Sequence, residues 1–98
     1  MSDGLVPQNA PTVNLPFEVA FRSMKDGRKI SRAGWGRPGM YLYYVPAQSY
    51  PAVTKIAKEE FGEMVPYGSY IAMKTHENVV PWNPSQTCMC ADDWQIVD

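Results

Sequence analysis

The stretch that most limits what this chain can fold into is residues 31–40, which reads Ser-Arg-Ala-Gly-Trp-Gly-Arg-Pro-Gly-Met. Three glycines and a proline within ten residues favour neither a regular helix nor a regular strand, so this stretch is expected to be a loop. Its one large side chain is Trp35, which has Arg32 and Arg37 on either side. Such a ring either fills part of a core or offers a flat face to a planar ligand, with the arginines near enough to meet negative charge.

The length and composition predict one small globular domain. The chain has 98 residues, of which 45% are apolar and 19% are charged. No apolar run approaches the ~20 residues of a membrane span, so we expect no membrane contact. A core of this size makes oligomerisation a natural way to bury more apolar surface. The first residues lack the basic start and apolar stretch of a secretory signal, so we expect a cytoplasmic protein.

Two segments have the apolar spacing of helices. Apolar residues at 17, 20, 21 and 24 follow the i, i+3, i+4, i+7 pattern, which predicts an amphipathic helix that starts at Pro16 and ends by Gly27. Apolar residues at 53, 56, 57 and 61 predict a second, shorter helix that ends at Gly62. Residues 1–14 have little periodicity and are expected to form a flexible N-terminal tail, which leaves residues 15–98 as the domain.

The remaining regular segments read as antiparallel strands. Residues 40–45 are rich in tyrosine and aliphatic side chains and predict a central strand, with Tyr41 and Tyr43 on one face and Leu42 on the other. Further strands are predicted at 29–32, in a hairpin of 69–74 with 79–82, and at 95–97. Residues 47–53 are interpreted as an irregular connection and 64–68 as a turn-prone link. The predicted fold is therefore a small α+β domain with an antiparallel sheet.

The charges are segregated along the chain, although the net charge is only −1. Residues 22–37 hold six of the nine basic side chains and one acid, whereas seven acids and one lysine follow residue 58. The net charge argues against binding to polymeric nucleic acid. The segregation is typical of solvated faces, but it also fits a local site for a small anion or two surfaces that pair between subunits. The sequence leaves these alternatives open.

Residues 82–87 gather short hydrogen-bonding side chains next to Trp82. In one interpretation, Asn83 or Ser85 caps a short helical turn that runs to Ala91, and Trp94 packs in the core. In the other, the same amides and hydroxyls bind a ligand whose flat part rests on an aromatic ring. The two interpretations are compatible, because a helix start also presents free backbone N–H groups.

The sequence offers little for catalysis or for a structural metal. His76 is the single histidine and lies in a predicted turn, so no convincing Ser/His/Asp set can be drawn. Asp92 and Asp93 are adjacent rather than arranged as a general acid and base. The Cys88-x-Cys90 pair could supply two zinc ligands, but a structural site needs four. We therefore expect neither an enzyme nor a bound cofactor.

A series of motifs in order along the chain resembles one known family. The motifs are Phe17-Glu18-x-Ala20, Gly27-Arg28-Lys29-Ile30-x-Arg32-x-Gly34-Trp35, Gly39-Met40-Tyr41-Leu42-Tyr43, Ile56-Ala57-Lys58-Glu59-Glu60-Phe61-Gly62, Val65-Pro66-Tyr67-Gly68-x-Tyr70-Ile71-Ala72-Met73-Lys74, Val80-Pro81-Trp82-x-x-Ser85-Gln86-Thr87 and Ala91-x-Asp93-Trp94. They resemble the second Thoeris anti-defence family, which is encoded by phages, over roughly residues 15–98. Where many relatives carry an acid and a leucine, this chain has Cys88 and Cys90.

The resemblance implies a function without catalysis, exerted in the cytoplasm of the infected bacterium. Members of the family sequester the cyclic ADP-ribose isomer made by the Thoeris TIR protein and do not cleave it. Some members also bind cyclic dinucleotides or trinucleotides of a second defence system, CBASS, at a separate site. The family forms homotetramers of small α+β subunits with ligand at the subunit interfaces, and this protein is expected to do the same.

The resemblance and the residue chemistry together give a set of candidate ligand-binding residues. The loop tryptophan of the family corresponds to Trp35. The full set is Trp35, Arg32, Arg37, Gly39, Tyr41, Tyr43, Trp82, Asn83, Ser85 and Gln86. The main alternative is an inhibitor that blocks a bacterial defence effector by direct contact, in which case Trp35 would be a hot spot for another protein.

Overall fold

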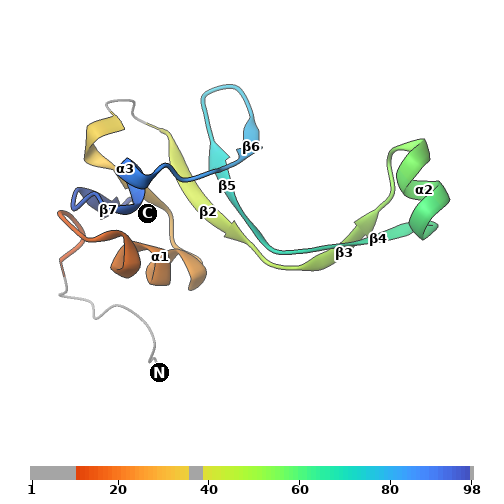
Figure 1. The fold of residues 1–98 in the computed structure, drawn as a ribbon, viewed down its shortest axis with the longest axis horizontal. Helices are drawn as coiled ribbons and strands as arrows, with labels where there is room; N and C mark the ends of the chain where they lie inside the picture. Colours follow the sequence, from red (N-terminus) through yellow and green to blue (C-terminus); the bar gives the residue numbers. More distant parts are fainter. Residues whose placement is uncertain (1–10, 36–38, 98) are drawn as a thin grey trace.

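A computed structural model describes residues 11–35 and 39–97. Helices and strands alternate irregularly along the chain (Figure 1). The elements are α1 (Phe17–Lys25), β1 (Ile30–Arg32), the 3₁₀ turn η1 (Ala33–Trp35), β2 (Tyr41–Val45), β3 (Gln48–Pro51), α2 (Lys55–Phe61), β4 (Met64–Tyr67), β5 (Tyr70–Lys74), β6 (Val79–Pro81), α3 (Gln86–Met89) and β7 (Trp94–Ile96).

Five of the strands form one antiparallel sheet in the order β6-β5-β2-β1-β7. Leu42 on β2 lies opposite Ile30 on one side and Met73 on the other, and Ile30 also pairs with Ile96. The predicted central strand is confirmed, because β2 is third of the five. The strand that carries Pro81 lies at the sheet edge, where a missing N–H is tolerated.

Helix α1 covers one face of this sheet, across β1, β2 and β7. Ala20 and Met24 on the helix are fully buried, as are Ile30 and Leu42 on the strands and Trp94 at the start of β7. Because side chains alternate along a strand, these strand residues share the face that meets the helix. The predicted amphipathic helix is therefore confirmed, and so is the α+β class.

The opposite face of the sheet carries a different set of side chains. Ser31 pairs with Gln95 in the register of β1 and β7, and Tyr41 pairs with Lys74 in that of β2 and β5. These residues alternate with the core residues, so they point away from α1. None of the helices in the described part of the chain packs on this side. We call the surface made by Lys29, Ser31, Tyr41, Tyr43, Lys74 and Gln95 the open sheet face.

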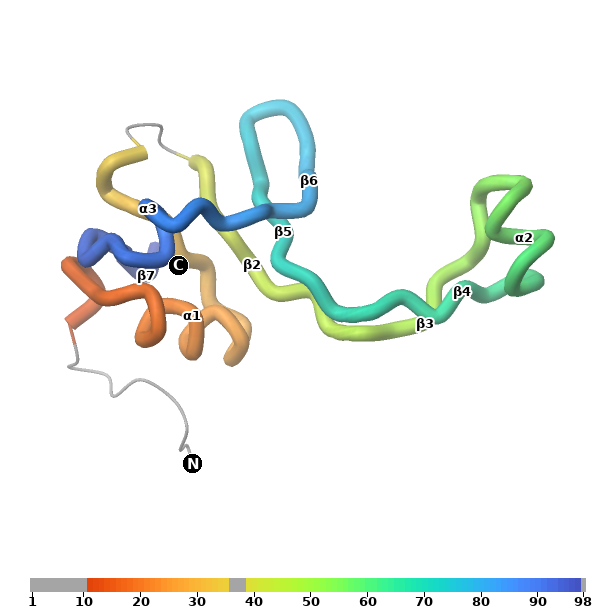
Figure 2. The backbone as a smooth tube through the Cα atoms, in the orientation of Figure 1, coloured from red at the N-terminus to blue at the C-terminus, as the bar shows by residue number. Residues whose placement is uncertain are grey.

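Strands β3 and β4 form a separate two-stranded ribbon that leaves the body and carries α2 at its far end (Figures 1 and 2). We call β3, α2 and β4 the arm. The Cα radius of gyration is 15.9 Å, compared with about 13 Å for a compact domain of 100 residues. The arm therefore accounts for a markedly elongated subunit.

The arm corrects two sequence-based interpretations. Residues 47–53 and 64–68, interpreted as a connection and a turn-prone link, contain paired strands with Ser49 opposite Pro66 and Pro51 opposite Met64. The prolines hid this pairing, because they normally argue against a strand. In a two-stranded ribbon both strands are edges, so an N–H can be missing from the outer side of each.

The second predicted helix is confirmed as α2, but its apolar side does not reach the core. The hydroxyl of Thr54 caps the helix by accepting a hydrogen bond from the Ala57 N–H at 3.1 Å. The side chain of Ile56 is 74% exposed and that of Phe61 is 56% exposed. The apolar spacing that predicts this helix therefore marks a surface that is uncovered in a single subunit.

Helix α3 confirms the capping interpretation of the segment after Trp82. The Ser85 hydroxyl accepts a hydrogen bond from the Cys88 N–H at 3.1 Å, and Trp94 is fully buried. The helix and the turn η1 add to the two helices that were predicted.

Most of the predicted tail, residues 1–10, lies outside the described residues, and the carbonyl of Thr12 accepts a hydrogen bond from the Ile96 N–H. No helix among the described residues is long and apolar enough to cross a membrane.

Candidate functional site

A cavity of about 420 Å³ lies beside β1, between β2, β7 and the turn η1. Its volume falls within the range of small-molecule sites. The lining residues are Lys29, Ser31, Arg32, Ala33, Trp35, Gly39, Met40, Tyr41, Gln95 and Val97. They combine two aromatic rings, hydroxyl and amide groups and two cations, and none of them is acidic.

Trp35 lies at the border of this cavity and packs against Trp94. The ring is partly buried and meets Trp94 edge-on, with 5.6 Å between the ring centroids and 77° between the planes. Trp35 therefore packs against the core and also lines the cavity. On the far side of the loop, Gly39 has a φ of +87°, a conformation that favours glycine. Arg37 lies outside the described residues.

Arg32, which was predicted to meet ligand charge, is engaged within the protein. Its Nε donates to Oδ1 of Asp93 at 2.8 Å, and its Nη2 donates to Oδ2 at 3.4 Å. On its other side, Nη1 donates to Sγ of Cys88 at 3.6 Å. Residues 31 and 32 point to opposite sides of β1, so the Arg32 guanidinium turns toward α3 rather than toward the open sheet face.

This arrangement changes the acidity of both partners of Arg32. The hydrogen bonds from Arg32 hold the pKa of the Asp93 carboxyl below its usual value, and the Gly34 N–H lowers it further. Burial alone would raise the pKa of the Cys88 thiol, but hydrogen bonds from Ser85 and Arg32 outweigh it and the pKa is lowered. Asp93 is therefore ionised at neutral pH and compensates the charge of Arg32.

Lys29 and Lys74 are the cations on the open sheet face. Its Nζ lies 4.9 Å from the centroid of the Tyr41 ring, and Nζ of Lys74 lies 5.9 Å from the same centroid. A second cavity, of about 300 Å³, shares Lys29 and Tyr41 with the first. Its lining residues are Gly27, Lys29, Tyr41, Tyr43, Lys74 and Val79, again without an acid. In the described part of the chain, no carboxylate forms an ion pair with Lys29.

The structure separates the predicted site residues into two groups. Arg32, Trp35, Gly39 and Tyr41 border the first cavity, and Tyr43 borders the second. The other predicted residues that the structure describes lie on the α3 side. Trp82 packs edge-on against Trp94 at 5.9 Å, Ser85 caps α3, and Asn83 and Gln86 are exposed beside it. None of these four lines either cavity.

Sequence reasoning missed Lys29, Ser31 and Gln95 as cavity residues. Lys29 was noted only as part of a basic run. Its place two residues before Ser31 puts both side chains on one face of the strand, and this is the signal that could have identified it. Gln95 joins them only through the pairing of β7 with β1, which the sequence does not reveal.

The chemistry of the first cavity suits a planar, negatively charged molecule. Trp35 and Tyr41 offer ring surfaces, Lys29 offers an ammonium group, and Ser31 and Gln95 offer polar groups, although Gln95 Nε2 already donates to Ser31 Oγ at 3.2 Å. The described residues contain no cluster of three or more potential metal ligands.

Comparison with known proteins places the chain in a family. The Thoeris anti-defense 2-like domain matches residues 15–97. The chain is also 33% identical over 87 residues to a protein of Bacillus phage SP01 named Thoeris anti-defense 2, and the alignment covers 85% of this chain and 94% of that protein. The family match spans the sheet, the arm and the Trp35 turn. The resemblance inferred from the ordered motifs is thus confirmed, and the chain belongs to the Thoeris anti-defense 2-like family.

Proposed function

We propose that this protein sequesters the cyclic ADP-ribose isomer made by the Thoeris TIR protein, so that the bacterial effector receives no signal. Membership of the family supports a phage anti-defence role against Thoeris. The ligand is the one that the family resemblance implies, and the chemistry of the cavity supports it. Cyclic dinucleotides and trinucleotides share the base and phosphate groups that this chemistry suits, so they are further candidate ligands. The host cytoplasm is the compartment in which such signals would be captured.

The observation that carries the proposal is the lining of the first cavity. A cyclic ADP-ribose isomer has an adenine ring, two riboses and a diphosphate. Trp35 can stack on the base, Ser31 and Gln95 can bind ribose hydroxyls, and Lys29 can meet the diphosphate. A negative ligand meets no carboxylate among these lining residues, so its charge is attracted and not repelled.

The energies indicate that stacking on Trp35 alone is not sufficient for tight capture. Stacking on an aromatic ring contributes roughly 1 to 3 kcal/mol. A nanomolar dissociation constant corresponds to about −12 kcal/mol. Charge-assisted hydrogen bonds from Lys29 and enclosure of the ligand by a second subunit are the two contributions that can close this gap.

Sequestration also fits a site without catalytic groups. A protein that only removes a signal gains nothing from stabilising a transition state, so it requires tight binding to the ground state. Rings, an ammonium group, a hydroxyl and an amide serve that purpose. We therefore propose release of the ligand in unchanged form.

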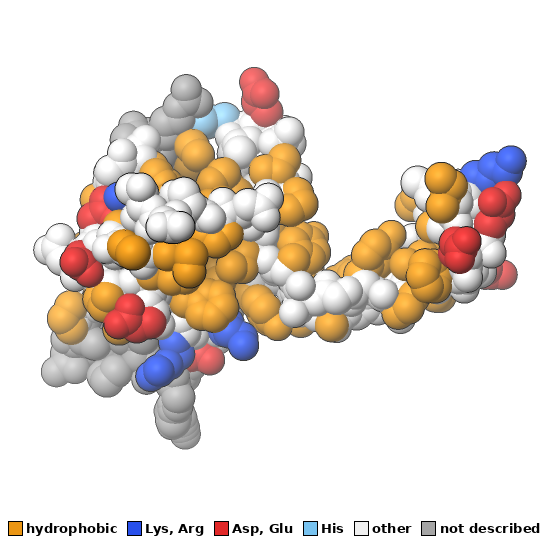
Figure 3. All heavy atoms as spheres, viewed as in Figure 1, with side chains coloured by type: hydrophobic (Ala, Val, Ile, Leu, Met, Phe, Trp, Pro, Cys, Tyr) orange, Lys and Arg blue, Asp and Glu red, His pale blue; other side chains and the backbone are white. Residues whose placement is uncertain are grey.

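We further propose that the subunits assemble into a homotetramer through the arm. Hydrophobic side chains run along the arm to α2 (Figure 3). Val53 is 85% exposed, and Ile56, Phe61 and Met64 are also exposed. An apolar surface of this kind on a small protein marks an interaction site. The partner that covers this apolar surface is a second copy of the chain, because another copy is always present at the same concentration.

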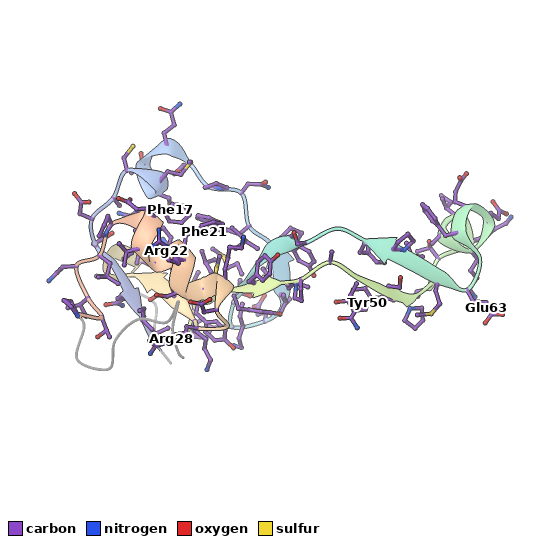
Figure 4. All side chains as sticks on the ribbon, turned by 90° about the horizontal axis from the view of Figure 1, so that it is seen from below. Phe17, Phe21, Arg22, Arg28, Tyr50 and Glu63 are labelled. Atoms are coloured by element: carbon purple, nitrogen blue, oxygen red, sulfur yellow. The ribbon has the colours of Figure 1, made fainter. Side chains whose placement is uncertain are left out.

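The charge distribution supports contact between the arm of one copy and the body of another. The end of the arm carries Glu59, Glu60 and Glu63 against Lys55 and Lys58, and Lys55 pairs with Glu59 at 3.9 Å, whereas the basic residues Arg22 and Arg28 lie on the body (Figure 4). Opposite charges at the two ends of an elongated subunit favour a head-to-tail approach. Such contact would bring a second surface toward the ligand.

The first prediction concerns capture. Purified protein mixed with the TIR-derived cyclic ADP-ribose isomer should lower the free concentration of the nucleotide, measured by mass spectrometry after ultrafiltration. Heating the mixture should denature the protein and return the nucleotide with its mass and retention time unchanged. Recovery of a linear or otherwise cleaved product would show an enzyme instead. If the nucleotide stays free while the defence effector co-purifies with the protein, the direct-contact inhibitor is the correct function.

The second prediction assigns the binding groups. Trp35→Ala should weaken nucleotide binding by the stacking contribution, about 5- to 150-fold in the dissociation constant. Lys29→Gln should weaken it about tenfold, because one charge-assisted hydrogen bond is lost. Isothermal titration calorimetry provides both measurements.

The matched control for Lys29 is Lys25→Gln. Lys25 lies on α1, where its Nζ is 5.9 Å from the Phe21 ring centroid and 5.7 Å from that of Tyr44, on the other side of the sheet. The same loss of charge there should leave the dissociation constant unchanged. Equal effects of the two lysine variants would contradict a specific role for Lys29. A Trp35→Ala protein that fails to fold would show that this ring is a core residue.

The third prediction concerns assembly. Multi-angle light scattering should give a mass near four times the 11.0 kDa subunit. Ile56→Asp should reduce that mass while the far-ultraviolet circular dichroism is retained, because a charge on the arm opposes burial of its apolar surface. Val19→Asp, an equivalent change on the exposed side of α1, should leave the mass unchanged. A monomeric parent protein would refute the proposed assembly.

A further inference from the structure

We infer that Asp93 is a positioning residue that holds the Trp35 turn in the orientation required for ligand binding. The inference rests on the proposed function, since it explains how the ring is kept ready for a ligand. Asp93 has no place in the cavity lining, so any effect it exerts on binding acts through the turn.

Asp93 binds three consecutive residues through three different acceptors. Its carbonyl oxygen accepts from the Ala33 N–H at 3.0 Å. Its Oδ1 accepts from Arg32 Nε at 2.8 Å, and its Oδ2 accepts from the Gly34 N–H at 3.0 Å. The residue that follows these three is Trp35. One amino acid therefore fixes both the backbone of the turn and the side chain that precedes it.

The fit between Asp93 and the turn favours glycine at position 34. A Cβ atom on Gly34 would lie 3.0 Å from Oδ2 of Asp93, which is closer than side-chain contacts normally allow. Asp93 cannot easily retreat, because Arg32 holds the other side of its carboxylate. Gly34 and Asp93 thus form one contact that either substitution would disturb.

The turn needs this external support. A 3₁₀ turn of three residues has poor internal hydrogen-bond geometry, so it holds its shape weakly alone. Asp93 is anchored by its own position directly before β7, where Arg32 pairs with Trp94. Trp94 also provides the edge against which Trp35 packs. Asp93 and Trp94 are held in place by the sheet, and they contact the turn and the Trp35 ring. They therefore fix the position of the ring relative to the sheet.

A ring fixed before binding loses less conformational freedom when the ligand arrives. The Asp93 carboxylate also compensates the Arg32 charge and keeps that side chain directed toward α3. The two cations of the first cavity thus have different roles. Arg32 supports the turn, and Lys29 is available to bind the ligand.

The test begins without any ligand, so that it is independent of the proposed function. Amide hydrogen exchange of Gly34, followed by NMR, should be at least tenfold faster in Asp93→Asn than in the parent protein. Asp92→Asn removes the same charge from the adjacent exposed residue and should leave the exchange of Gly34 unchanged. Unchanged exchange in Asp93→Asn would overturn the inference.

The second part measures binding of the TIR-derived cyclic ADP-ribose isomer in a double-mutant cycle. Asp93→Asn and Gly34→Ala should each weaken binding about tenfold, and the double variant should be weakened about tenfold as well, because both changes break one contact. A hundredfold loss in the double variant, or no loss in either single variant, would overturn the positioning role. If Asp93→Asn does not fold, Gly34→Ala alone decides the question through amide exchange at Trp35 and through affinity. Absence of binding to the parent protein would refute the proposed function but leave the exchange result valid.

Discussion

The fold depends on the packing of one nine-residue helix against a five-stranded sheet. A helix of this length covers only one face, and Ala20 and Met24 bury that face against Ile30 and Leu42. The opposite face of the sheet carries Lys29, Ser31, Tyr41 and their neighbours, whose side chains can bind a ligand. Within residues 11–35 and 39–97, β3, α2 and β4 form the arm, and no further helix covers this side. The two cavities lie on this uncovered face of the sheet, where a second layer of helices would otherwise pack.

Much of this architecture could be predicted from the sequence. The apolar spacing of α1 and α2, the alternation in β2 and the capping of α3 by Ser85 are local signals, and the structure bears them out. The arm could not be predicted in the same way. Pro51 and Pro66 interrupt both of its strands, and their tolerance depends on pairing in a two-stranded ribbon that is visible only in three dimensions. Local patterns therefore predicted the elements and the hairpin of β5 with β6, but not the pairing of β3 with β4.

The candidate site was only partly predictable for the same reason. Trp35, Gly39 and Tyr41 were identified from composition and resemblance, and they lie together at one cavity. Arg32 also lines this cavity, as predicted, but the sequence does not reveal that it pairs with Asp93, which is 61 residues away. Lys29 was overlooked because its importance comes from facing the same side as Ser31 and Tyr41. Asn83, Ser85 and Gln86 lie on the other side of the sheet, so the nine predicted residues that the structure describes do not all line one cavity within a single subunit.

The central claim is that a nucleotide binds at the Trp35 cavity and not beside α3. A crystal structure of the protein with the TIR-derived cyclic ADP-ribose isomer tests this claim most directly. We expect the adenine ring against Trp35 and the diphosphate within hydrogen-bonding distance of Lys29, with Arg32 still paired to Asp93. A nucleotide bound next to Trp82, Asn83 and Gln86, with the cavity beside Trp35 empty, would contradict it.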